Sequence, residues 1–134
     1  PPVPPFAEEV ASTPGGFLTG WMDLVFRCNK RFYLLDWKSN ALSSYTRGAL
    51  EQAMQTRRYD LQYRIYLAAL RRWFKRVMPG FDERTDFGGV YYLFLRGMKP
   101  DGGSSGIYFH QPCVDDWDER KLAQVLWRSP RGMA

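Results

Sequence analysis

"YLLDWKSNALSS" (residues 33–44) joins the most hydrophobic segment of the chain to a pair of opposite charges. Aromatic and aliphatic residues in a row are typical of a β-strand, which we place at 31–38. Because side chains alternate across a strand, Asp36 and Lys38 leave the same face. The segment therefore predicts a strand that ends with a carboxylate and an ammonium group side by side.

Two interpretations of this pair are open on the residues alone. One is an ion pair at a strand end. The other is a site for a hard divalent cation, because Mg²⁺ prefers carboxylate oxygens together with phosphate and water. A nearby lysine can stabilise the charge that develops on a phosphoryl group. An isolated D-x-K motif does not decide between the ion pair and the cation site. The surrounding sequence is therefore needed to distinguish them.

Strand and helix patterns alternate along the rest of the chain. Apolar residues between 46 and 77 recur at spacings typical of one long helix, which Pro79-Gly80 ends. The apolar run at 88–96 predicts a strand covered on both faces. The other expected elements are a strand at 16–27, a hairpin break at 28–30, a short strand at 107–111 and a helix at 115–127. This order predicts an α/β fold with a mixed sheet.

A second acidic residue, Asp23, lies in the strand that precedes the break. A plain hairpin is expected to separate Asp23 from Asp36 by several residues. On this expectation, the two carboxylates converge only if the strands bend or their register is offset.

Composition limits the class of protein. The chain has 134 residues, of which 45% are hydrophobic and 16% aromatic, which suits one globular domain. No apolar run approaches the roughly 20 residues of a membrane helix. The formal net charge of +5 is a modest excess that suits a phosphate-backbone partner without proving one.

Cys28 and Cys113 are far apart and in no C-x-x-C spacing. This argues against a disulfide framework and against a cysteine-ligated zinc or iron–sulfur site. We expect two free thiols in a reducing cytoplasm.

The expected organisation has three parts. Residues 1–15 form a Pro-rich linker, 16–114 the core and 115–134 a C-terminal helix and tail. The start, which is Pro-rich and has no Met, looks like a linker in front of a domain taken from a longer protein.

Four strings of the sequence match one known pattern: "GFLTGWMDLVF", "FYLLDWKSN", "RYDLQYRIYLAAL" and "FGGVYYLFLRG". They contain G-x-x-D, hydrophobic-D-x-K and Q-hydrophobic-x-x-Y motifs in order. In this the chain resembles the PD-(D/E)XK nuclease superfamily, specifically the nuclease domains of its RecB branch. The resemblance runs from about Gly16 to Pro112. It implies a restriction-endonuclease-like core, with a mixed sheet flanked by helices and the first helix lacking.

The resemblance implies a role for each matching residue. Asp23 and Asp36 match the metal-binding aspartates, and the backbone carbonyl of Trp37 often completes the metal shell in this fold. Lys38 matches the catalytic lysine, which orients or helps to deprotonate the attacking water. The implied cofactor is Mg²⁺, with Mn²⁺ accepted in its place, and no iron–sulfur cluster.

Gln62 and Tyr66 match the Q-x-x-x-Y pair. They are four residues apart, on one face of the expected helix, and the resemblance places them beside the active site near the DNA backbone. Arg58 is a further candidate for DNA contact. With Arg57, Arg64 and Lys75 it could bind phosphate, although most of these side chains are more simply explained as a solvated helix face.

One feature of the branch is missing from the expected site. Its members commonly carry a further ligand, a His or an acidic residue, on a helix before the first strand. Here the upstream segment offers only Glu8 and Glu9. The single histidine, His110, lies downstream and is expected to be structural or on the surface.

The implied function is a Mg²⁺-dependent deoxyribonuclease domain of the exodeoxyribonuclease V type, acting in double-strand break repair and recombination. The implied partners are DNA, RecC- and RecD-like subunits, the helicase part of the same chain and a RecA-like recombinase, all in the bacterial cytoplasm. The alternative is a catalytically incomplete fragment that binds DNA or docks a protein. An unrelated basic α/β module is the third interpretation.

Overall fold

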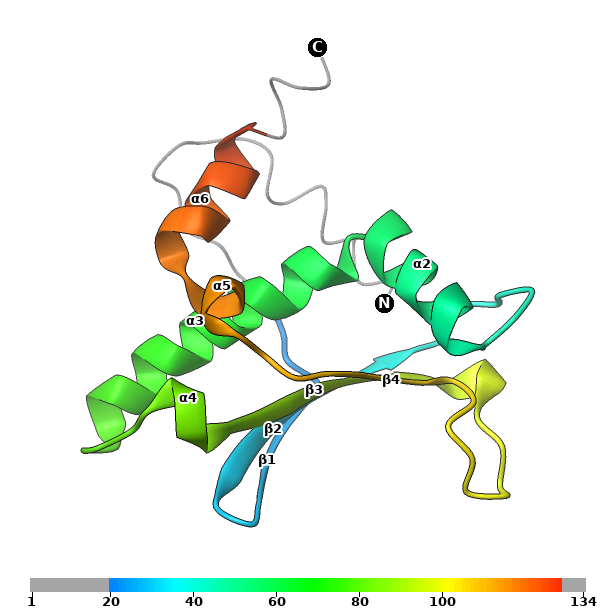
Figure 1. The fold of residues 1–134 in the computed structure, drawn as a ribbon, viewed down its shortest axis with the longest axis horizontal. Coiled ribbons are helices and arrows are strands. Elements are labelled where there is room, and N and C mark those ends of the chain that lie inside the picture. The colour runs from blue at the N-terminus through cyan, green and yellow to red at the C-terminus, as the bar shows by residue number, and fades with distance from the viewer. Residues whose placement is uncertain (1–19, 129–134) are drawn as a thin grey trace.

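The structure, a computed structural model, describes residues 20–128, which form a four-stranded sheet with helices packed on one face (Figure 1). The strands lie in the order β1 (Leu24–Cys28), β2 (Arg31–Lys38), β3 (Phe87–Phe94) and β4 (Ile107–His110). The helices are α2 (Arg47–Thr56), α3 (Tyr59–Val77), α4 (Glu83–Asp86), α5 (Val114–Trp117) and α6 (Glu119–Arg128), and a 3₁₀ turn (Leu95–Gly97) follows β3. β2 pairs with β3 in parallel and the other pairs are antiparallel, so the predicted mixed sheet is confirmed. Within the described range, no helix combines the length and the apolar composition that a transmembrane span requires.

A two-residue turn joins β1 to β2. Asn29 and Lys30 have φ angles of 49° and 65°, and two successive positive φ values are characteristic of the type I′ turn, whose twist matches that of paired strands. The turn places Cys28 opposite Arg31. Cys28 is therefore the last residue of β1 and not part of the break.

The register of this hairpin corrects the expectation for the two carboxylates. Leu24 is opposite Leu35, and one step further along the same register Asp23 faces Asp36. The expectation that a plain hairpin would keep them apart was wrong because the turn is tight and symmetric. The first strand is also shorter than predicted, since β1 begins at Leu24 and Asp23 lies just before it.

The helix expected over 46–77 is interrupted in the structure. α2 ends at Thr56 and α3 begins at Tyr59, and Arg58 between them has a φ angle of 57°. Figure 1 shows the two helices meeting at an angle. The apolar spacing continues on both sides and no Gly or Pro marks the break, so periodicity alone predicted one helix. A non-glycine residue in the left-handed region costs about 1 kcal/mol, which the surrounding packing has to offset.

The C-terminal helix expected at 115–127 is also divided. α5 and α6 are separated at Asp118, whose backbone is extended with ψ 110°. Trp117 at the end of α5 is 5% exposed and lies against Phe87, with ring centroids 5.6 Å apart. α5 is therefore packed into the same core as the sheet. The short helix α4 was not predicted.

Asp116 of α5 ties this segment to the rest of the fold. It is 2% exposed, its Oδ2 lies 2.7 Å from Nε2 of His110, and its Oδ1 lies 3.4 Å from Nε of Arg64. The ring of His110 also packs against Tyr63, with a centroid distance of 5.1 Å. These contacts support the structural role expected of His110. They also give Arg64 a carboxylate partner within the protein.

The two faces of β3 differ. Val90, Tyr92 and Phe94 are fully buried against the helices. Tyr91, on the other face, is only partly buried, and no described helix or strand covers that face (Figure 1). The prediction for 88–96 of a strand covered on both faces is therefore met on one face only within residues 20–128.

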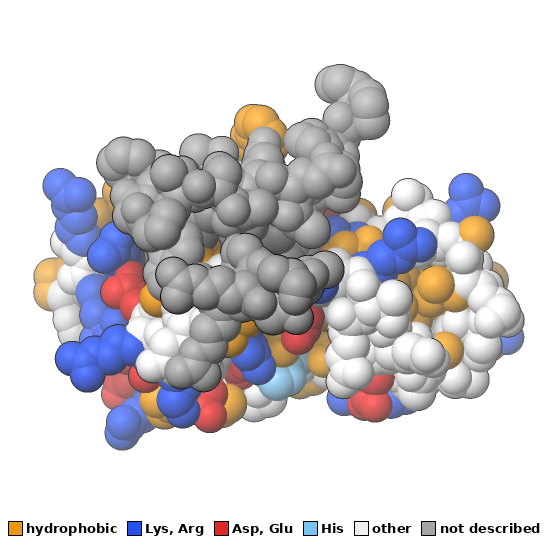
Figure 2. All heavy atoms as spheres, turned by 90° about the horizontal axis from the view of Figure 1, so that it is seen from above, with side chains coloured by type: hydrophobic (Ala, Val, Ile, Leu, Met, Phe, Trp, Pro, Cys, Tyr) orange, Lys and Arg blue, Asp and Glu red, His pale blue; other side chains and the backbone are white. Residues whose placement is uncertain are grey.

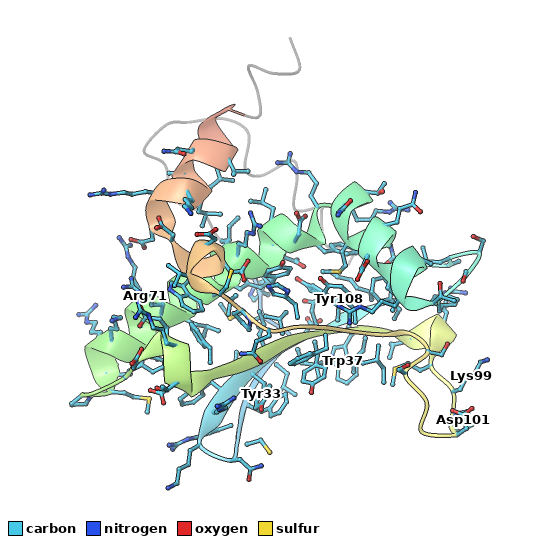
Figure 3. All side chains as sticks on the ribbon, in the orientation of Figure 1. Tyr33, Trp37, Arg71, Lys99, Asp101 and Tyr108 are labelled. Carbon is cyan, nitrogen blue, oxygen red and sulfur yellow. The ribbon has the colours of Figure 1, made fainter. Side chains whose placement is uncertain are left out.

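The face of the sheet that points away from the helices carries a row of aromatic rings. Their centroids are 5.2 Å apart between Phe26 and Tyr33, 6.0 Å between Tyr33 and Tyr91, and 4.8 Å between Tyr91 and Phe109. Figure 3 shows Tyr33 and Trp37 extending from the sheet on the side opposite the helices. The rings pack against one another across the strands, which stabilises the sheet laterally.

An ion-pair cluster joins α3 to α4. Glu83, whose side chain is 12% exposed, accepts from Arg71 at 2.8 Å and lies 3.1 Å from Nζ of Lys75. Figure 2 shows basic and acidic side chains interspersed at one end of the molecule. Lys75 is thus engaged by a carboxylate, which weakens the prediction that it contacts phosphate.

Glu83 is expected to make stability sensitive to acid. Burial would raise the pKa of Glu83, but Arg71 and Lys75 outweigh it and lower this pKa from 4.5 to about 2. The carboxylate therefore stabilises the fold fully above pH 4.5, and the contribution is lost as the pH falls toward 2. We expect Glu83→Gln to cost about 1–2 kcal/mol at pH 7 and progressively less below pH 4.5, measured by urea unfolding across pH.

The matched control for this prediction is Glu51→Gln, which removes an exposed pair with Arg47 on α2. That pair is worth at most about 0.5 kcal/mol. An equal loss of stability in the two variants would contradict the role assigned to Glu83.

Candidate active site

Two carboxylates, those of Asp23 and Asp36, face each other at the open end of the β1–β2 hairpin, away from its turn. Asp36, on the helix-covered face of β2, is 4% exposed, whereas Asp23 is exposed. Oδ2 of Asp23 accepts a hydrogen bond of 2.8 Å from the backbone N–H of Trp37. This bond orients the Asp23 carboxylate toward the end of β2.

The environment of Asp36 disfavours its negative charge. Burial raises the pKa of Asp36 most, Lys38 opposes this increase, and the charge of Asp23 adds to it. Oδ2 of Asp36 lies 2.8 Å from Nζ of Lys38 in an ion pair. Two neighbouring carboxylates, one of them buried and with a single ammonium partner, are an arrangement that a divalent cation would stabilise.

Lys38 lies on the same face as Asp36, as the strand pattern predicted. Its ammonium group is 3.2 Å from Oε1 of Gln62 and 4.0 Å from the centroid of the Tyr59 ring. The side chain is 14% exposed. One group from β2, Asp36, and two from α3, Tyr59 and Gln62, therefore surround one ammonium.

A chain of hydrogen bonds connects this lysine to the start of the hairpin. Oε1 of Gln62 also accepts from the hydroxyl of Tyr92 at 2.7 Å, and Nε2 of Gln62 donates to the Tyr66 hydroxyl at 3.4 Å. The Tyr66 hydroxyl in turn donates to the backbone carbonyl of Trp21 at 2.8 Å. Gln62 and Tyr66 thus share one face of α3, as predicted, and that face lies against the site.

Gly20 contributes by its small size. A Cβ atom built there would lie 3.2 Å from the Tyr66 hydroxyl and ring, which is tighter than an ordinary van der Waals contact. The glycine of the G-x-x-D motif therefore allows the chain before Asp23 to pass close to the tyrosine of the Q-x-x-x-Y motif.

The donor set fits a hard divalent cation. Carboxylate oxygens are the ligands that Mg²⁺ and Mn²⁺ prefer. The pKa of Asp36 is raised mainly by burial and further by the charge of Asp23, and a cation between the two carboxylates would offset both effects. Among residues 20–128 the pair is not joined by a third His, Cys, Asp or Glu in a metal-binding cluster. The upstream candidates, Glu8 and Glu9, lie outside the described residues.

The model of the PD-(D/E)XK nuclease superfamily matches residues 2–133 of the chain. The chain belongs to the PD-(D/E)XK nuclease superfamily. The resemblance stated from the motifs is therefore confirmed. Nucleases of this superfamily generally use divalent metal ions.

Among proteins of this superfamily, the chain is similar to RecB subunits. It is 48% identical over 101 residues to the RecBCD enzyme subunit RecB of Escherichia coli, which covers 72% of this chain and 9% of that protein. The same subunit of Haemophilus influenzae is 46% identical over 104 residues, with 75% and 8% covered. That of Borreliella burgdorferi is 32% identical over 121 residues, with 83% and 10% covered. The chain thus spans about a tenth of the length of these relatives.

The PD-(D/E)XK motifs converge in this structure. Asp23 of G-x-x-D, Asp36 and Lys38 of D-x-K, and Gln62 and Tyr66 of Q-x-x-x-Y are linked by the contacts described above. Trp37 contributes its N–H to Asp23, and a ligand role for its carbonyl remains a prediction.

Two site residues were not predicted. Tyr92 is opposite Asp36 in the parallel register of β2 and β3, and Tyr59 reaches Lys38 from the first turn of α3. Both lie within apolar or helical patterns that suggest core packing. The apolar run that contains Tyr92 follows a helix and so indicates a strand parallel to β2. The sequence does not indicate which residue of β2 would lie opposite Tyr92.

Proposed function

We propose that this chain is the nuclease domain of a RecBCD-type helicase–nuclease and that it hydrolyses phosphodiester bonds of DNA with a divalent cation. The observation that carries the proposal is the hairpin register that sets Asp23 opposite Asp36, with Lys38 beside them. The similarity to RecB subunits supports this assignment.

Each residue of the site has a separate role in the proposed reaction. Asp23 and Asp36 hold Mg²⁺, or Mn²⁺ in its place, together with the backbone carbonyl of Trp37. When bound, the cation supplies positive charge that polarises the scissile phosphate and makes water more acidic. Nζ of Lys38 orients the attacking water and faces the negative charge that develops on the phosphate. Gln62 accepts a hydrogen bond from Nζ of Lys38 through its Oε1.

The similarity to RecB subunits supports a proposal for the setting of this domain. The domain acts within a longer chain that carries a helicase, with RecC- and RecD-like subunits, in double-strand break repair and recombination in the bacterial cytoplasm. A RecA-like recombinase is a further partner. The boundary between core and C-terminal part, expected at residue 114, falls within α5, which packs into the same core as the sheet; the other expected boundaries remain predictions.

A cleavage assay tests the catalytic proposal. A 5′-labelled single-stranded oligonucleotide is incubated with the full-length polypeptide that carries this sequence, in Mg²⁺ and in EDTA. We expect fragments in Mg²⁺ and none in EDTA. Cleavage that continues at the same rate in EDTA would contradict a metal-dependent mechanism.

A second function is favoured by one observation: the described residues provide two carboxylates and no third ligand in a cluster. On this alternative the chain binds DNA or docks a protein without cleaving. Binding of the oligonucleotide in Mg²⁺ with no fragments would support the alternative and contradict the nuclease proposal.

Arg58 is expected to bind the DNA backbone beside the site. Its left-handed conformation directly precedes Tyr59, whose ring contacts the catalytic lysine. Arg58→Asn removes the charge and keeps a residue that tolerates this backbone conformation. We expect about 3- to 10-fold weaker binding of single-stranded DNA and a salt dependence shallower by about 0.7 in the logarithmic slope, measured by fluorescence anisotropy.

The control for this prediction is Arg72→Asn on α3. Arg72 lies about 20 Å along this helix from Tyr59 at 1.5 Å per residue, so its loss should change DNA affinity by less than about twofold. If both variants weakened binding equally, Arg58 would contribute only to the overall charge.

A further inference from the structure

The ammonium group of Lys38 is held by unequal contacts. The ion pair with Oδ2 of Asp36 is 2.8 Å long, and the contact with Oε1 of Gln62 is 3.2 Å long. That same Gln62 oxygen accepts a shorter bond, 2.7 Å, from Tyr92. Apart from the ion pair, the hydrogen bond to Gln62 therefore positions the ammonium weakly.

The closest remaining neighbour is the face of an aromatic ring. Nζ of Lys38 lies 4.0 Å from the ring centroid of Tyr59 and 5.4 Å from that of Tyr92. Both distances are within the roughly 6 Å over which a ring attracts a cation. Tyr59 is the nearer of the two rings and makes the stronger contact.

The ring of Tyr59 is itself fixed in place. Its hydroxyl donates to Oδ1 of Asn40 at 3.2 Å, and its ring meets Tyr92 edge to face at a centroid distance of 5.7 Å. Asn40 lies just beyond β2, in the segment that follows Lys38. The ring is therefore held by the segment that directly follows β2 and by Tyr92 of β3.

The break between α2 and α3 determines where the Tyr59 ring lies. Tyr59 is the first residue of α3, directly after Arg58 in the left-handed conformation. Backbone strain of this kind is retained where the surroundings require it, and it clusters at functional sites. The strain at Arg58 is an observation independent of the ring contact, and both point to Tyr59.

We propose that Tyr59 is a positioning residue for the catalytic lysine: its ring face binds the Lys38 ammonium and keeps it aimed at the reacting phosphate. This inference rests on the proposed nuclease function. A cation held by Asp36 would compete with Lys38 for the Asp36 carboxylate. The lysine then retains Gln62 and the Tyr59 ring, so the ring matters most in the state that reacts.

The test compares two substitutions in the full-length polypeptide. Tyr59→Phe keeps the ring and loses the hydroxyl, whereas Tyr59→Leu keeps apolar volume and loses the ring. We expect kcat for the labelled oligonucleotide to fall about tenfold in Tyr59→Leu and less than twofold in Tyr59→Phe, with KM unchanged in both. Tyr63→Leu, which removes a buried ring packed against Tyr92 and His110, should lower Tm but leave kcat within about twofold.

Fluorinated phenylalanines at position 59 separate electrostatics from shape. Each added fluorine weakens the attraction of the ring face for a cation and changes the ring volume little. We therefore expect kcat to fall stepwise with the number of fluorines at constant KM and Tm, a response that a purely structural role of the ring would not produce.

Reductive methylation gives a readout that does not depend on cleavage. In metal-free protein, Lys38 should be methylated faster in Tyr59→Leu than in wild type or Tyr59→Phe, while exposed Lys30 is unchanged, as measured by mass spectrometry of peptides. An unchanged Lys38 rate together with an unchanged kcat in Tyr59→Leu would overturn this inference and leave the nuclease proposal standing. No cleavage by the wild type in Mg²⁺ would overturn both.

Discussion

Asp36→Asn is expected to abolish cleavage and at the same time to stabilise the metal-free protein. The substitution removes a metal ligand, and we expect kcat to fall by at least about 1,000-fold. Activity and stability should move in opposite directions because the carboxylate that the reaction needs is unfavourable for the fold.

The pKa of Asp36 explains the gain in stability. Burial raises this pKa in the folded state, with Lys38 opposing and Asp23 adding to the shift. A carboxyl group whose pKa is raised on folding costs stability above its folded pKa, and the cost disappears as the pH falls below the unfolded value. In EDTA at pH 7 we expect Asp36→Asn to have a Tm about 2–4 °C above wild type, a difference that shrinks as the medium becomes acidic.

Thermal unfolding with and without Mg²⁺ completes this test. Mg²⁺ should raise the Tm of the wild type by binding the folded state alone, and should not raise that of Asp36→Asn. Asp115→Asn, which changes an exposed carboxylate paired with Lys121, is the matched control and should keep both the activity and the response to Mg²⁺. A full Mg²⁺ response in Asp36→Asn would show that Asp36 is not a ligand.

Lys38→Met should give the second-largest loss of activity. Unlike Asp36→Asn, it should keep the rise in Tm that Mg²⁺ produces. Methionine keeps most of the length and packing of the side chain but not its charge, so we expect kcat to fall by about 100-fold or more. The metal-free variant should be less stable by about 2–3 kcal/mol, because Asp36 loses its counter-ion in a buried position.

Mg²⁺ should then restore more stability than it does in the wild type. In Lys38→Met no ammonium would compete with the cation for the Asp36 carboxylate, so the Mg²⁺-induced rise in Tm should be larger. Lys99→Met, on the exposed loop before β4 (Figure 3), is the matched control and should change neither value. If Lys38→Met lost the Mg²⁺ response, the lysine would act by supporting the metal site.

Parts of the site that depend on local periodicity could be predicted from the sequence. The alternation of a strand places Asp36 and Lys38 on one face, and the spacing of four in a helix places Gln62 and Tyr66 together. The motifs that contain them identified the superfamily. Their catalytic roles remain predictions for the experiments above.

The convergence of the two carboxylates was missed although its cause is local. Asn29 and Lys30 both adopt positive φ, and Asn favours such a turn but Lys does not. Residues 28–30 were therefore predicted only as a break. One residue more or less in that turn would move Asp23 away from its place opposite Asp36.

The sequence by itself determined the strand that carries D-x-K, the helix face that carries Q-x-x-x-Y and the superfamily, because these depend on the spacing of residues within one element. Only the tertiary structure decided which groups meet at the ammonium of Lys38. Tyr92 arrives through the parallel register of β2 and β3, and Tyr59 through a helix break at Arg58 that carries no Gly or Pro signal. These contacts join residues far apart in the chain, and packing of the whole domain stabilises the strained backbone that makes one of them.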